Sequence, residues 1–464
     1  MLTGKESVEK VIKTYEARTP KCKAHQEKAS TYLPGGDTRN RAYYHPYPLT
    51  IDKAKGCRIT DLDGNEYIDL LNNFSSLIHG HSYDPIIEAV HQQMVKSAAH
   101  GAFDEIQYVL AKELCERNHI EQIRFCNSGT EATMFAMRTA RIFTGKEGII
   151  RMDGAYHGSH DFAGVNETPD FRAKGMPGLT FDPGIPKCLG EAIYPVPFND
   201  ADAIETVLKQ SADKIAGVIL EPIPFSGGLE LPKPGYLQAV RDLCDKYGVL
   251  LIFDEVVCFR LHEGGYHTCC GVMPDIIAFG KIIGGGFPIG AFGAREQIMR
   301  MYNPAVNENP VGHSGTFSGN AIVMAAGAAA MQHFKQKDVD RINALGDRFR
   351  EKSRKMFSDA GVIGCAIGWG SIGAIGFMND HGKGTIADNI KDFMMQYRQS
   401  IPRSSIYQLA LINHGVYIAN RGALAISTAT TEADIDDVIV RASEALEDIR
   451  PFVLEEQEKY GETL

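Results

Sequence analysis

The chain has 464 residues, of which 44% are hydrophobic and 23% are charged, a composition typical of globular proteins with two or three domains. Its formal net charge of −10 and its lack of basic blocks argue against binding to nucleic acid or to an anionic membrane. No apolar run approaches the ~18 residues that cross a bilayer, and the N-terminus is polar, so we expect a cytoplasmic protein without membrane segments. The ten cysteines include no CxxC pair and are expected to be reduced thiols.

The N-terminal segment, residues 1–84, is expected to contain a β-hairpin. Its stretch "KGCRITDLDGNEYIDL" places an Asp-Gly dipeptide between two strand-like runs, and this dipeptide favours a tight hairpin turn. We expect the segment to pack with the C-terminal part of the chain.

Residues 85–330 alternate between strand-like and helix-like stretches. The strand-like stretches are "HIEQIRFCNSG", "EGIIRMDG", "KIAGVILEP", "GVLLIFDEV" and "IIAF". Continuous apolar runs of this kind fit parallel strands that are covered on both faces. The stretches "TEATMFAMRTARIFTG" and "GYLQAVRDLCDKYG" have helical patterns. The alternation predicts a large α/β domain with a mostly parallel sheet.

Residues 331–464 differ in character and are expected to form a smaller α+β domain. The stretch "VDRINALGDRFREKSRKMFSDAG" has the pattern of a charged amphipathic helix, and "IGAIGFMND" and "GVYIANRGALAIST" resemble short strands. A last helix is expected from Thr431 onward, because Thr431 and Asp434 have the spacing of a capping box.

Polar residues stand where the predicted strands of the large domain end. They are Ser128-Gly129-Thr130, Asp153 with Tyr156 and His157, Glu221, Asp254 and Lys281. Ligands of open α/β sheets bind beyond the carboxyl ends of the strands, so we expect these residues to share one rim.

Two of these residues stand in apolar surroundings that do not suit a charge. Lys281 lies in the glycine-rich stretch "DIIAFGKIIGGGFPIGAFG". Most lysines are solvated, but a desolvated lysine loses its proton more readily and can form a Schiff base. Asp254 ends a strongly apolar strand, where a carboxylate needs a cationic partner such as a protonated ring nitrogen or a buried arginine.

The motif "NSGTE" and the aromatic residue Tyr156 each have two interpretations. Ser128 and Glu131 have capping-box spacing, and the start of the helix that they cap is either an ordinary helix end or a phosphate site. Tyr156 either stacks on a flat ring or packs in the core. A phosphate cradle, a carboxylate, an aromatic residue and a reactive lysine are together what pyridoxal phosphate requires.

Two further motifs are set aside. The stretch "GWGSIG" leads into a strand-like run rather than the helix that a dinucleotide site requires. The histidine pairs in "HGH" and "HGSHD" have no carboxylate or cysteine at a standard ligand spacing, so no metal site is expected.

The chain resembles the class III aminotransferases, which are pyridoxal-phosphate enzymes of fold type I. The resemblance rests on "RFCNSGTEA", "GAYHGS", "VILEP", "LLIFDEV", "AFGKIIGGGFPIGAFG" and "HSGTFSGN", in the family's order. It implies a mostly parallel seven-stranded sheet with helices on both faces plus a smaller α+β domain. Within this class, "LPGGDTRNRAYYHPYPLTI" and "DEVVCFRL" are similar to aminotransferases acting on β-amino acids, and glutamate-1-semialdehyde aminomutase also belongs to the class.

The resemblance also implies roles for individual residues. Lys281 would form the Schiff base with pyridoxal 5'-phosphate, and Asp254 would bind its ring nitrogen. The remaining cofactor residues would be Ser128, Gly129 and Thr130 at the phosphate, Tyr156 and Val256 on the two ring faces, with His157 and Glu221 nearby. Thr316 would reach the phosphate from a neighbouring subunit, which implies a homodimer. Arg39 and Arg421 would contact the substrate, with Arg39 holding its carboxylate.

The expected activity is transfer of an amino group from a carboxylate-bearing amine, expected to be a β-amino acid, to a keto acid. Lys281 would act as the general base. Ser226 stands where ornithine-type relatives have a glutamate, which argues against an ornithine-like substrate. The alternatives are a 2,1-aminomutase of the glutamate-1-semialdehyde type, a racemase or epimerase of the same fold, and a binding protein without catalytic activity.

Overall fold

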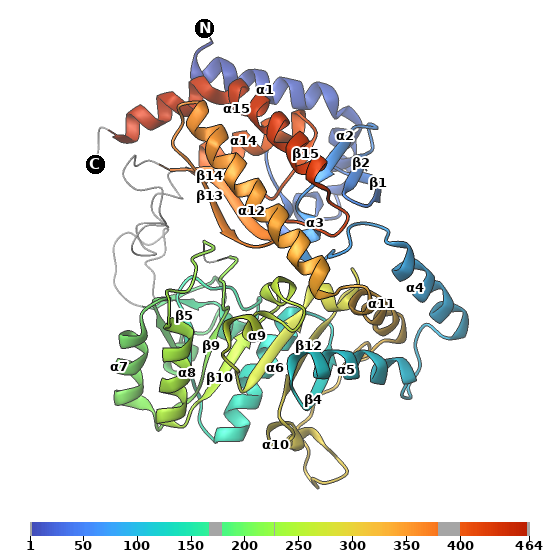
Figure 1. The fold of residues 1–464 in the computed structure, drawn as a ribbon, viewed down its shortest axis with the longest axis vertical. Coiled ribbons are helices and arrows are strands. Elements are labelled where there is room, and N and C mark those ends of the chain that lie inside the picture. Colours follow the sequence, from blue (N-terminus) through green and yellow to red (C-terminus); the bar gives the residue numbers. More distant parts are fainter. Residues whose placement is uncertain (1, 167–178, 227, 379–399, 462–464) are drawn as a thin grey trace. The chain divides into compact units, whose positions relative to one another are not determined.

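The structure is a computed structural model that describes residues 2–166, 179–226, 228–378 and 400–461. The chain divides into two units (Figure 1): unit 1 is Met1–Tyr83 with Asp340–Leu464, and unit 2 is Asp84–Val339. All ten cysteines are free thiols. Within the described ranges, no helix combines the length and the apolarity that crossing a membrane requires.

A seven-stranded sheet forms the centre of unit 2 (Figure 1). In spatial order its strands are β4 (Gln122–Cys126), β12 (Gly290–Ala294), β11 (Ile276–Gly280), β10 (Leu250–Asp254), β9 (Ile215–Leu220), β5 (Gly148–Met152) and β8 (Ile193–Val196). β12 runs antiparallel to both of its neighbours, and the other pairings are parallel. The predicted seven-stranded, mostly parallel sheet is therefore confirmed.

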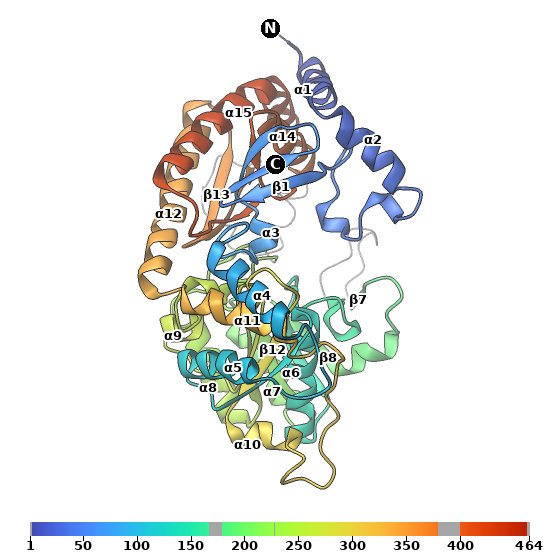
Figure 2. The same cartoon turned by 90° about the vertical axis from the view of Figure 1, so that its right-hand side faces the viewer.

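Both faces of this sheet are buried. Successive side chains of a strand point to opposite faces, and on β10 the pair Leu250 and Ile252 belongs to a core cluster that includes residues of α6 (Gly129–Thr144). Leu251 and Phe253 point to the other face, and they are buried as well. Figures 1 and 2 show the helices around the sheet. Besides α6, the helices of unit 2 are α4 (Asp84–Lys96), α5 (Glu105–Asn118), α7 (Ala201–Ser211), α8 (Tyr236–Tyr247), α9 (Tyr266–Cys270), α10 (Glu296–Met299) and α11 (Ala321–Gln332).

The two helices predicted in this region have clear stop signals, and α6 also has a capping residue at its start. α6 begins after Ser128, and α8 carries its buried apolar residues at helical spacing, with Leu237, Val240 and Cys244 on the inner side. Each helix ends at a glycine in the left-handed region, Gly145 (φ 70°) and Gly248 (φ 63°). Glycine adopts this conformation without the steric cost of a Cβ, which explains both helix ends.

Unit 1 combines helices with two small sheets. The first sheet contains β1 (Ile51–Lys55), β2 (Arg58–Asp61), β3 (Glu66–Asp69) and β15 (Val416–Tyr417); the second contains β13 (Gly364–Trp369), β14 (Ile372–Phe377) and β16 (Ala423–Ala425). β2 and β3 form the hairpin predicted around the Asp-Gly turn. β15 pairs in parallel with β3, so segments from the two ends of the chain share one sheet. A short two-stranded ribbon in unit 2 joins β6 (Val165–Asn166) to β7 (Thr180–Phe181).

The helices of unit 1 are α1 (Gly4–Arg18), α2 (Pro20–Ala29), α3 (Asn72–Ser75), α14 (Ile401–Asn413) and α15 (Glu432–Gly461), together with most of α12 (Gln336–Asp359). The capping box predicted for the last helix is confirmed. Thr431 Oγ1 accepts a hydrogen bond from Asp434 N at 3.2 Å, and Asp434 Oδ2 accepts one from Thr431 N at 2.8 Å.

The short helix α3 is left-handed, which the sequence did not predict. Its four residues have φ values of 47°, 49°, 55° and 71°. This conformation costs on the order of 1–2 kcal/mol per residue for most L-amino acids and less for asparagine. The buried carboxylate of Asp69 offsets part of this cost, because its Oδ1 accepts from Leu71 N at 2.7 Å and from Asn72 N at 3.0 Å. Strain that the surroundings support in this way often marks a functional segment.

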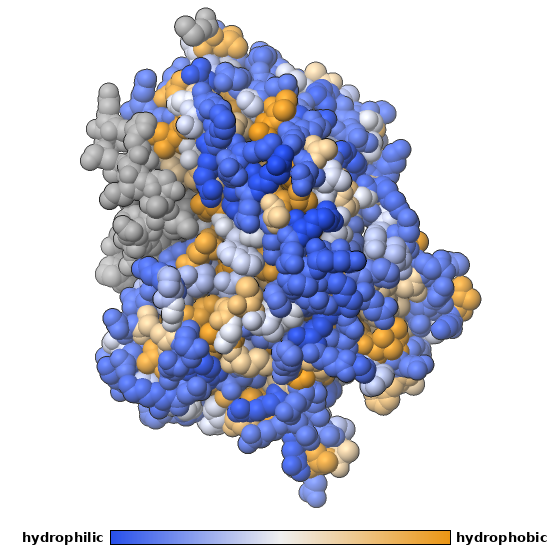
Figure 3. Space-filling model, in the orientation of Figure 1, coloured by the Kyte–Doolittle hydropathy of each residue, from blue (hydrophilic) through white to orange (hydrophobic). Residues whose placement is uncertain are grey.

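The surface in Figure 3 is largely hydrophilic, with separate apolar patches. In unit 2, α4 exposes Ile87, Met94 and Val95, and the nearby chain exposes Phe103 and Tyr108. Scattered apolar residues are normal on a soluble surface, but several on neighbouring elements indicate a surface that another molecule can cover.

Candidate active site

The carboxyl ends of five strands meet at one edge of the seven-stranded sheet. β5, β9, β10 and β11 run parallel, and β4 runs in the same direction because β12 is antiparallel to both β11 and β4. Beyond β4 lies Ser128, beyond β5 Asp153, and beyond β9 Glu221, while Asp254 ends β10 and Lys281 follows β11. The structure thus brings together the residues that the sequence placed at the strand ends.

Asp254 and His157 form a buried pair. His157 Nδ1 lies 2.8 Å from Asp254 Oδ2, and Asp254 Oδ1 accepts a hydrogen bond from Val256 N at 3.1 Å. Burial lowers the pKa of His157 below its usual value, although Asp254 acts in the opposite direction. A neutral imidazole that donates from Nδ1 to the carboxylate satisfies both groups. Nε2 of His157 is then buried without a hydrogen-bond partner among the described residues.

Glu221 is a second buried carboxyl group at this rim. Its Oε1 accepts from Tyr156 N and its Oε2 from Phe225 N, each at 3.2 Å. Burial raises the pKa of Glu221 to about 8, the negative charge of Asp254 adds to the rise, and the positive charge of Lys281 opposes it. The negative charge of Asp254 therefore makes it harder for Glu221 to ionise, and the positive charge of Lys281 makes it easier.

Lys281 occupies an unusual backbone conformation. β11 is fully buried up to Gly280, and Lys281 is the half-buried first residue of a 3-10 turn that ends at Gly284. Its φ is 51°, in the left-handed region that lysine rarely adopts. A non-glycine residue held in this region is a feature of functional sites, since the surrounding structure must maintain it against its cost.

The start of α6 is the helix end at which a phosphate site is predicted. Ser128 caps the helix, and its Oγ accepts from Glu131 N at 3.2 Å. The predicted capping box differs in one detail, because Glu131 Oε2 accepts from Asn127 N at 2.7 Å, one residue before the cap. The side chains of Ser128, Glu131 and Thr130 are half-buried, so the first turn of this helix remains accessible. Its unpaired N–H groups suit a phosphate.

Glycines allow the first turn of α6 to pack closely against the neighbouring strand ends. A Cβ on Gly129 would lie 3.0 Å from Val256 Cγ1, and a Cβ on Gly280 would lie 3.2 Å from the same atom. Gly158, at φ 94°, leaves so little room that a Cβ would lie 2.7 Å from the Cα of Thr130. The glycines therefore allow the loops after β4, β5 and β11 to approach one another closely.

Tyr156 is partly exposed, and a buried arginine supports its loop. The relative exposure of Tyr156 is 40%, so this residue is not packed in the core. Arg151, on β5, is fully buried; its guanidinium donates to the carbonyls of Ala155 and Val165 and to Asn166 Oδ1. Burial lowers the pKa of Arg151 to about 10. The sequence analysis missed Arg151, although a charged residue inside the apolar run "GIIRM" was an available signal.

Thr133 is a second supporting residue that the sequence analysis missed. Its Oγ1 donates to the His157 carbonyl at 2.5 Å and lies 3.4 Å from His160 Nε2. Burial lowers the pKa of His160 to about 4, so this histidine is neutral at physiological pH. Nothing in the sequence distinguishes Thr133 from other polar residues of α6.

Three predicted residues lie elsewhere in the chain. Thr316 is an exposed residue of the turn over residues 316–319, and its contact with a neighbouring subunit stays a prediction. Arg39 and Arg421 belong to unit 1, and their roles also stay predictions. Arg421 has φ 75° in a turn closed by a hydrogen bond from Gly422 N to Ala419 O at 2.9 Å. Arginine is uncommon in this left-handed turn position, where glycine is preferred.

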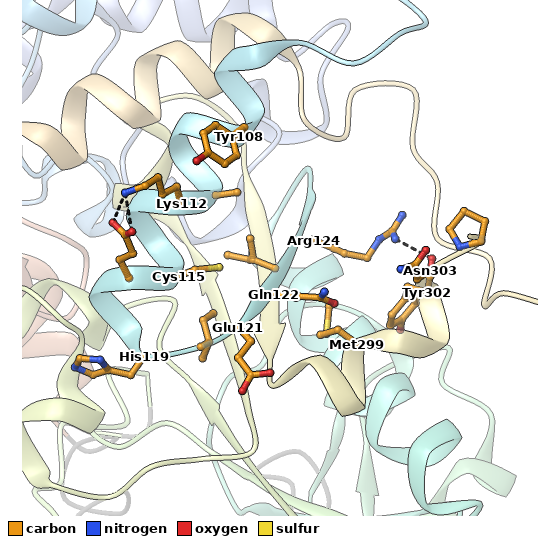
Figure 4. Close-up of a pocket in the computed structure, with 15 residues that line it drawn as sticks. Tyr108, Lys112, Cys115, His119, Glu121, Gln122, Arg124, Met299, Tyr302 and Asn303 are labelled. Atoms are coloured by element: carbon orange, nitrogen blue, oxygen red, sulfur yellow. Dashed lines mark hydrogen bonds and ion pairs between the residues drawn. The ribbon is translucent and has the colours of Figure 1, made fainter. Parts of the chain in front are cut away.

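A large surface groove lies at the opposite end of β4 (Figure 4). It has a volume of about 810 Å³ and is lined by residues of α5, by the start of β4 and by the segment after α10. Lys112 pairs with Glu116 at 2.6 Å on its wall, and Arg124 donates to Tyr302 O at 3.2 Å. None of the residues at the carboxyl edge lines this groove, so its size does not make it the active site.

One group of metal-type ligands occurs in the described part of the chain. Ligand atoms of Cys22, Asp61 and Asp63 lie within 4.8 Å of one another. The oxygens of Asp61 already accept hydrogen bonds from Asp63 N, from Asn65 and from Tyr67 OH. Asp63 accepts from two backbone N–H groups at the start of α2. These carboxylates serve the fold, and we assign no metal to them.

A sheet of this order with a lysine, two buried carboxyl groups and a helix N-terminus at its carboxyl edge defines a pyridoxal-phosphate-dependent transferase of fold type I. The chain belongs to the class-III aminotransferase family, whose model matches residues 40–449.

Similar proteins include both mutases and transaminases. A glutamate-1-semialdehyde 2,1-aminomutase from Syntrophobacter fumaroxidans is 36% identical over 433 residues, which is 90% of this chain and 95% of that protein. The solved omega-transaminase from Sphaerobacter thermophilus is 35% identical with a TM-score of 0.84, covering 92% of this chain and 98% of that one. A β-phenylalanine aminotransferase from Variovorax paradoxus is 29% identical with a TM-score of 0.85, covering 96% and 97%.

The cofactor of this family is pyridoxal 5'-phosphate. The rim fits this molecule in several respects. The accessible first turn of α6 offers N–H groups for a phosphate, and Gly129 lets this turn lie close to Val256. Asp254 offers a buried carboxylate for a cationic ring nitrogen, Tyr156 offers an exposed ring, and Lys281 offers the amine.

Proposed function

We propose that this enzyme moves an amino group on a substrate that carries a carboxylate, with Lys281 and Asp254 as its catalytic residues. The observation that carries the proposal is the cluster of Lys281, Glu221 and the Asp254–His157 pair at the carboxyl edge of the sheet, beside the start of α6. In this cluster the pKa of Glu221 is raised and that of His157 is lowered, and titratable groups with such shifts in such a place are typical of an active site.

The chemistry divides between the cofactor and the chain. When bound, pyridoxal phosphate supplies an aldehyde that captures an amine and a ring that accepts electrons from the neighbouring carbon. Lys281 Nζ removes the proton from the amine-bearing carbon and later returns one. Asp254 keeps a positive charge on the ring nitrogen, and His157 orients that carboxylate by donating from Nδ1. Glu221 holds the backbone of Tyr156 by accepting a hydrogen bond from its N–H group, and Tyr156 would contact the cofactor ring.

Two reactions are compatible with this machinery. The similarity to curated 2,1-aminomutases favours transfer within one molecule, as in glutamate-1-semialdehyde aminomutase. The stretch "LPGGDTRNRAYYHPYPLTI" and the similarity to the omega-transaminase and the β-phenylalanine aminotransferase favour transfer from a β-amino acid to a keto acid. The comparisons with curated proteins support the aminomutase reaction more strongly, so we place it first and the β-amino-acid reaction second.

The requirement for a keto acid separates the two reactions. The holoenzyme is incubated with glutamate 1-semialdehyde alone, and in parallel with β-phenylalanine plus 2-oxoglutarate or pyruvate. We expect turnover of the semialdehyde without any keto acid, giving the isomer with the amino group on the adjacent carbon. Turnover of β-phenylalanine that depends on the keto acid would instead establish the aminotransferase.

Two further outcomes complete this experiment. Exchange of the carbon-bound proton in deuterated water without amine transfer would identify a racemase or epimerase. Absence of turnover and of exchange with a wide panel of α-, β- and ω-amino donors would overturn the proposal. The Lys281→Ala variant, which should be inactive, is the negative control in each of these assays.

Arg39→Lys should reduce kcat/KM for carboxylate-bearing substrates by ~10- to 200-fold. A guanidinium binds a carboxylate through two parallel donors, and lysine keeps the charge but loses this fork. The expected loss corresponds to ~1.5–3 kcal/mol of charge-assisted hydrogen bonding. Steady-state kinetics with the identified substrate measure it. An amine without a carboxylate, if it is accepted, should react almost unchanged. Equal losses for both kinds of substrate would assign Arg39 to the fold instead.

We also infer that the enzyme works as a homodimer in which Thr316 approaches the cofactor of the neighbouring subunit. The exposed apolar residues of α4, α5 and the turn at Phe317 support this inference, because a second copy could bury them.

A further inference from the structure

Two consecutive residues of the left-handed helix α3 hold the guanidinium of Arg39. Arg39 Nη1 donates to Asn73 Oδ1 at 2.7 Å, and the guanidinium carbon lies 5.7 Å from the centre of the Phe74 ring. Asn73 Nδ2 donates to Ser76 Oγ at 3.0 Å, which turns the amide oxygen toward Arg39. The arginine is therefore oriented by one hydrogen bond and one aromatic face.

The left-handed backbone makes this double contact possible. In an extended strand, successive side chains point to opposite faces, so neighbouring residues would not reach the same guanidinium. Hydrogen bonds of Asp69 and Asn72 hold α3 in this conformation. Asp69 Oδ1 accepts from the N–H groups of Leu71, just before α3, and of Asn72, its first residue. Asp69 Oδ2 lies 2.6 Å from His81 Nε2, and Asn72 Nδ2 donates to Ala425 O at 2.6 Å.

The acceptor that orients Arg39 carries no charge. Within the described ranges, no carboxylate lies within 4.0 Å of the Arg39 guanidinium. Asp37, the nearest acid in the sequence, accepts a hydrogen bond from Thr38 N at 2.6 Å. Arg39 is thus directed by a neutral amide, and its positive charge is left for a ligand with a negative charge.

We propose that α3 orients Arg39 for recognition of the substrate carboxylate, and that Asn73 and Phe74 are positioning residues that contribute to substrate specificity. This inference rests on the proposed function, in which Arg39 binds that carboxylate. Asn73 sets the direction of the guanidinium without neutralising it, and Phe74 supports its face.

Asn73→Gly and Asn73→Asp test the proposal from two sides. Glycine tolerates the left-handed conformation, so Asn73→Gly removes the acceptor while preserving the turn. We expect KM for the carboxylate-bearing substrate to rise about 5- to 30-fold, as for the loss of one hydrogen bond to a charged group, with kcat within about twofold of wild type. Aspartate also tolerates this conformation and keeps the hydrogen bond, but it neutralises Arg39. KM should therefore rise in Asn73→Asp as well, which a purely structural role of Asn73 does not predict.

The control and a binding measurement complete the test. Ser82→Gly also introduces a glycine at a left-handed position of unit 1 (φ 49°), and this control should leave KM unchanged. Inhibition constants of the holoenzyme for 3-phenylpropanoate and pentanoate, two carboxylates without an amine, should rise in both Asn73 variants.

The outcomes separate this inference from the proposed function. If Arg39→Lys weakens binding of both carboxylates and the Asn73 variants do not, the positioning role of α3 is wrong and the role of Arg39 stands. If Arg39→Lys leaves both inhibition constants unchanged, Arg39 does not bind the carboxylate and both are wrong. Losses in kcat and thermal stability without a change in these inhibition constants would make α3 purely structural.

Discussion

Lys281→Ala should abolish turnover while leaving the fold intact. The variant lacks the amine that we propose links the enzyme to its cofactor and acts as the base at the substrate carbon. A general base alone contributes ~10²–10⁴-fold to rate, so we expect kcat to fall by ~10⁴ or more. Steady-state assays with the substrate identified above measure this loss, and circular dichroism with thermal unfolding checks the fold. Alanine and lysine carry similar costs at the left-handed φ of 51°, so stability should change little.

Chemical labelling provides an independent measurement for the same residue. Reduction of the wild-type holoenzyme with borohydride, followed by peptide mapping, should place the pyridoxyl group on Lys281. Lys209→Ala is the matched control, because Lys209 is an exposed lysine of unit 2 that pairs with Glu205 on α7. That variant should be labelled and active like the wild type. Label on another lysine, or substantial activity in Lys281→Ala, would show that the assignment is wrong.

The central strands of the large sheet were predictable because they are continuous apolar runs, whereas the number of seven strands was implied by the family resemblance. Buried parallel strands such as Leu250–Asp254 need apolar residues on both faces, and the glycines after α6 and α8 mark where the crossover helices end. The residues that follow the strands could be named for the same reason, because parallel strands place their carboxyl ends on one edge. The sequence placed Asp254 and His157 at the same edge of the sheet, but it did not predict their hydrogen bond. A contact between a side chain of β10 and one from the loop after β5 depends on the geometry of that loop.

The supporting residues around the rim were much harder to predict. Arg151 and Thr133 act through the backbone carbonyls of the loop around Tyr156 and His157, and a sequence contains no information on which carbonyls a buried donor will reach. The left-handed helix α3 contradicts local propensity, since Phe74 and Ser75 do not favour positive φ. Its conformation is supported by the nearby carboxylate of Asp69 and by the tertiary contact of Asn72 with Ala425 O.

The buried position of Asp254 also predicts a large effect of removing its charge. Asp254→Asn nearly preserves the shape and the hydrogen bond from Val256 N, but it removes the negative charge that we propose stabilises a protonated ring nitrogen. We expect the cofactor to remain bound and kcat/KM to fall by ~10² or more, which corresponds to ~2.7 kcal/mol of transition-state stabilisation. Kinetics and the cofactor content of the purified variant measure the two effects. An unchanged rate would make this carboxylate purely structural.

The same substitution has a second consequence that can be measured without turnover. In the protein freed of cofactor, burial and the charge of Asp254 raise the pKa of Glu221 to about 8 from its ordinary 4.5. Between these two pH values the unfolded chain has released the Glu221 proton and the folded chain still holds it, so the free energy of unfolding falls as the pH rises. Asp254→Asn removes one cause of the raised pKa, and the loss of stability between pH 5 and pH 8 should therefore become smaller. Urea unfolding of the wild-type and variant apoproteins at these two pH values measures the difference. An equal or steeper loss in the variant would mean that the charge of Asp254 does not act on Glu221, and that the two carboxyl groups do not share one site.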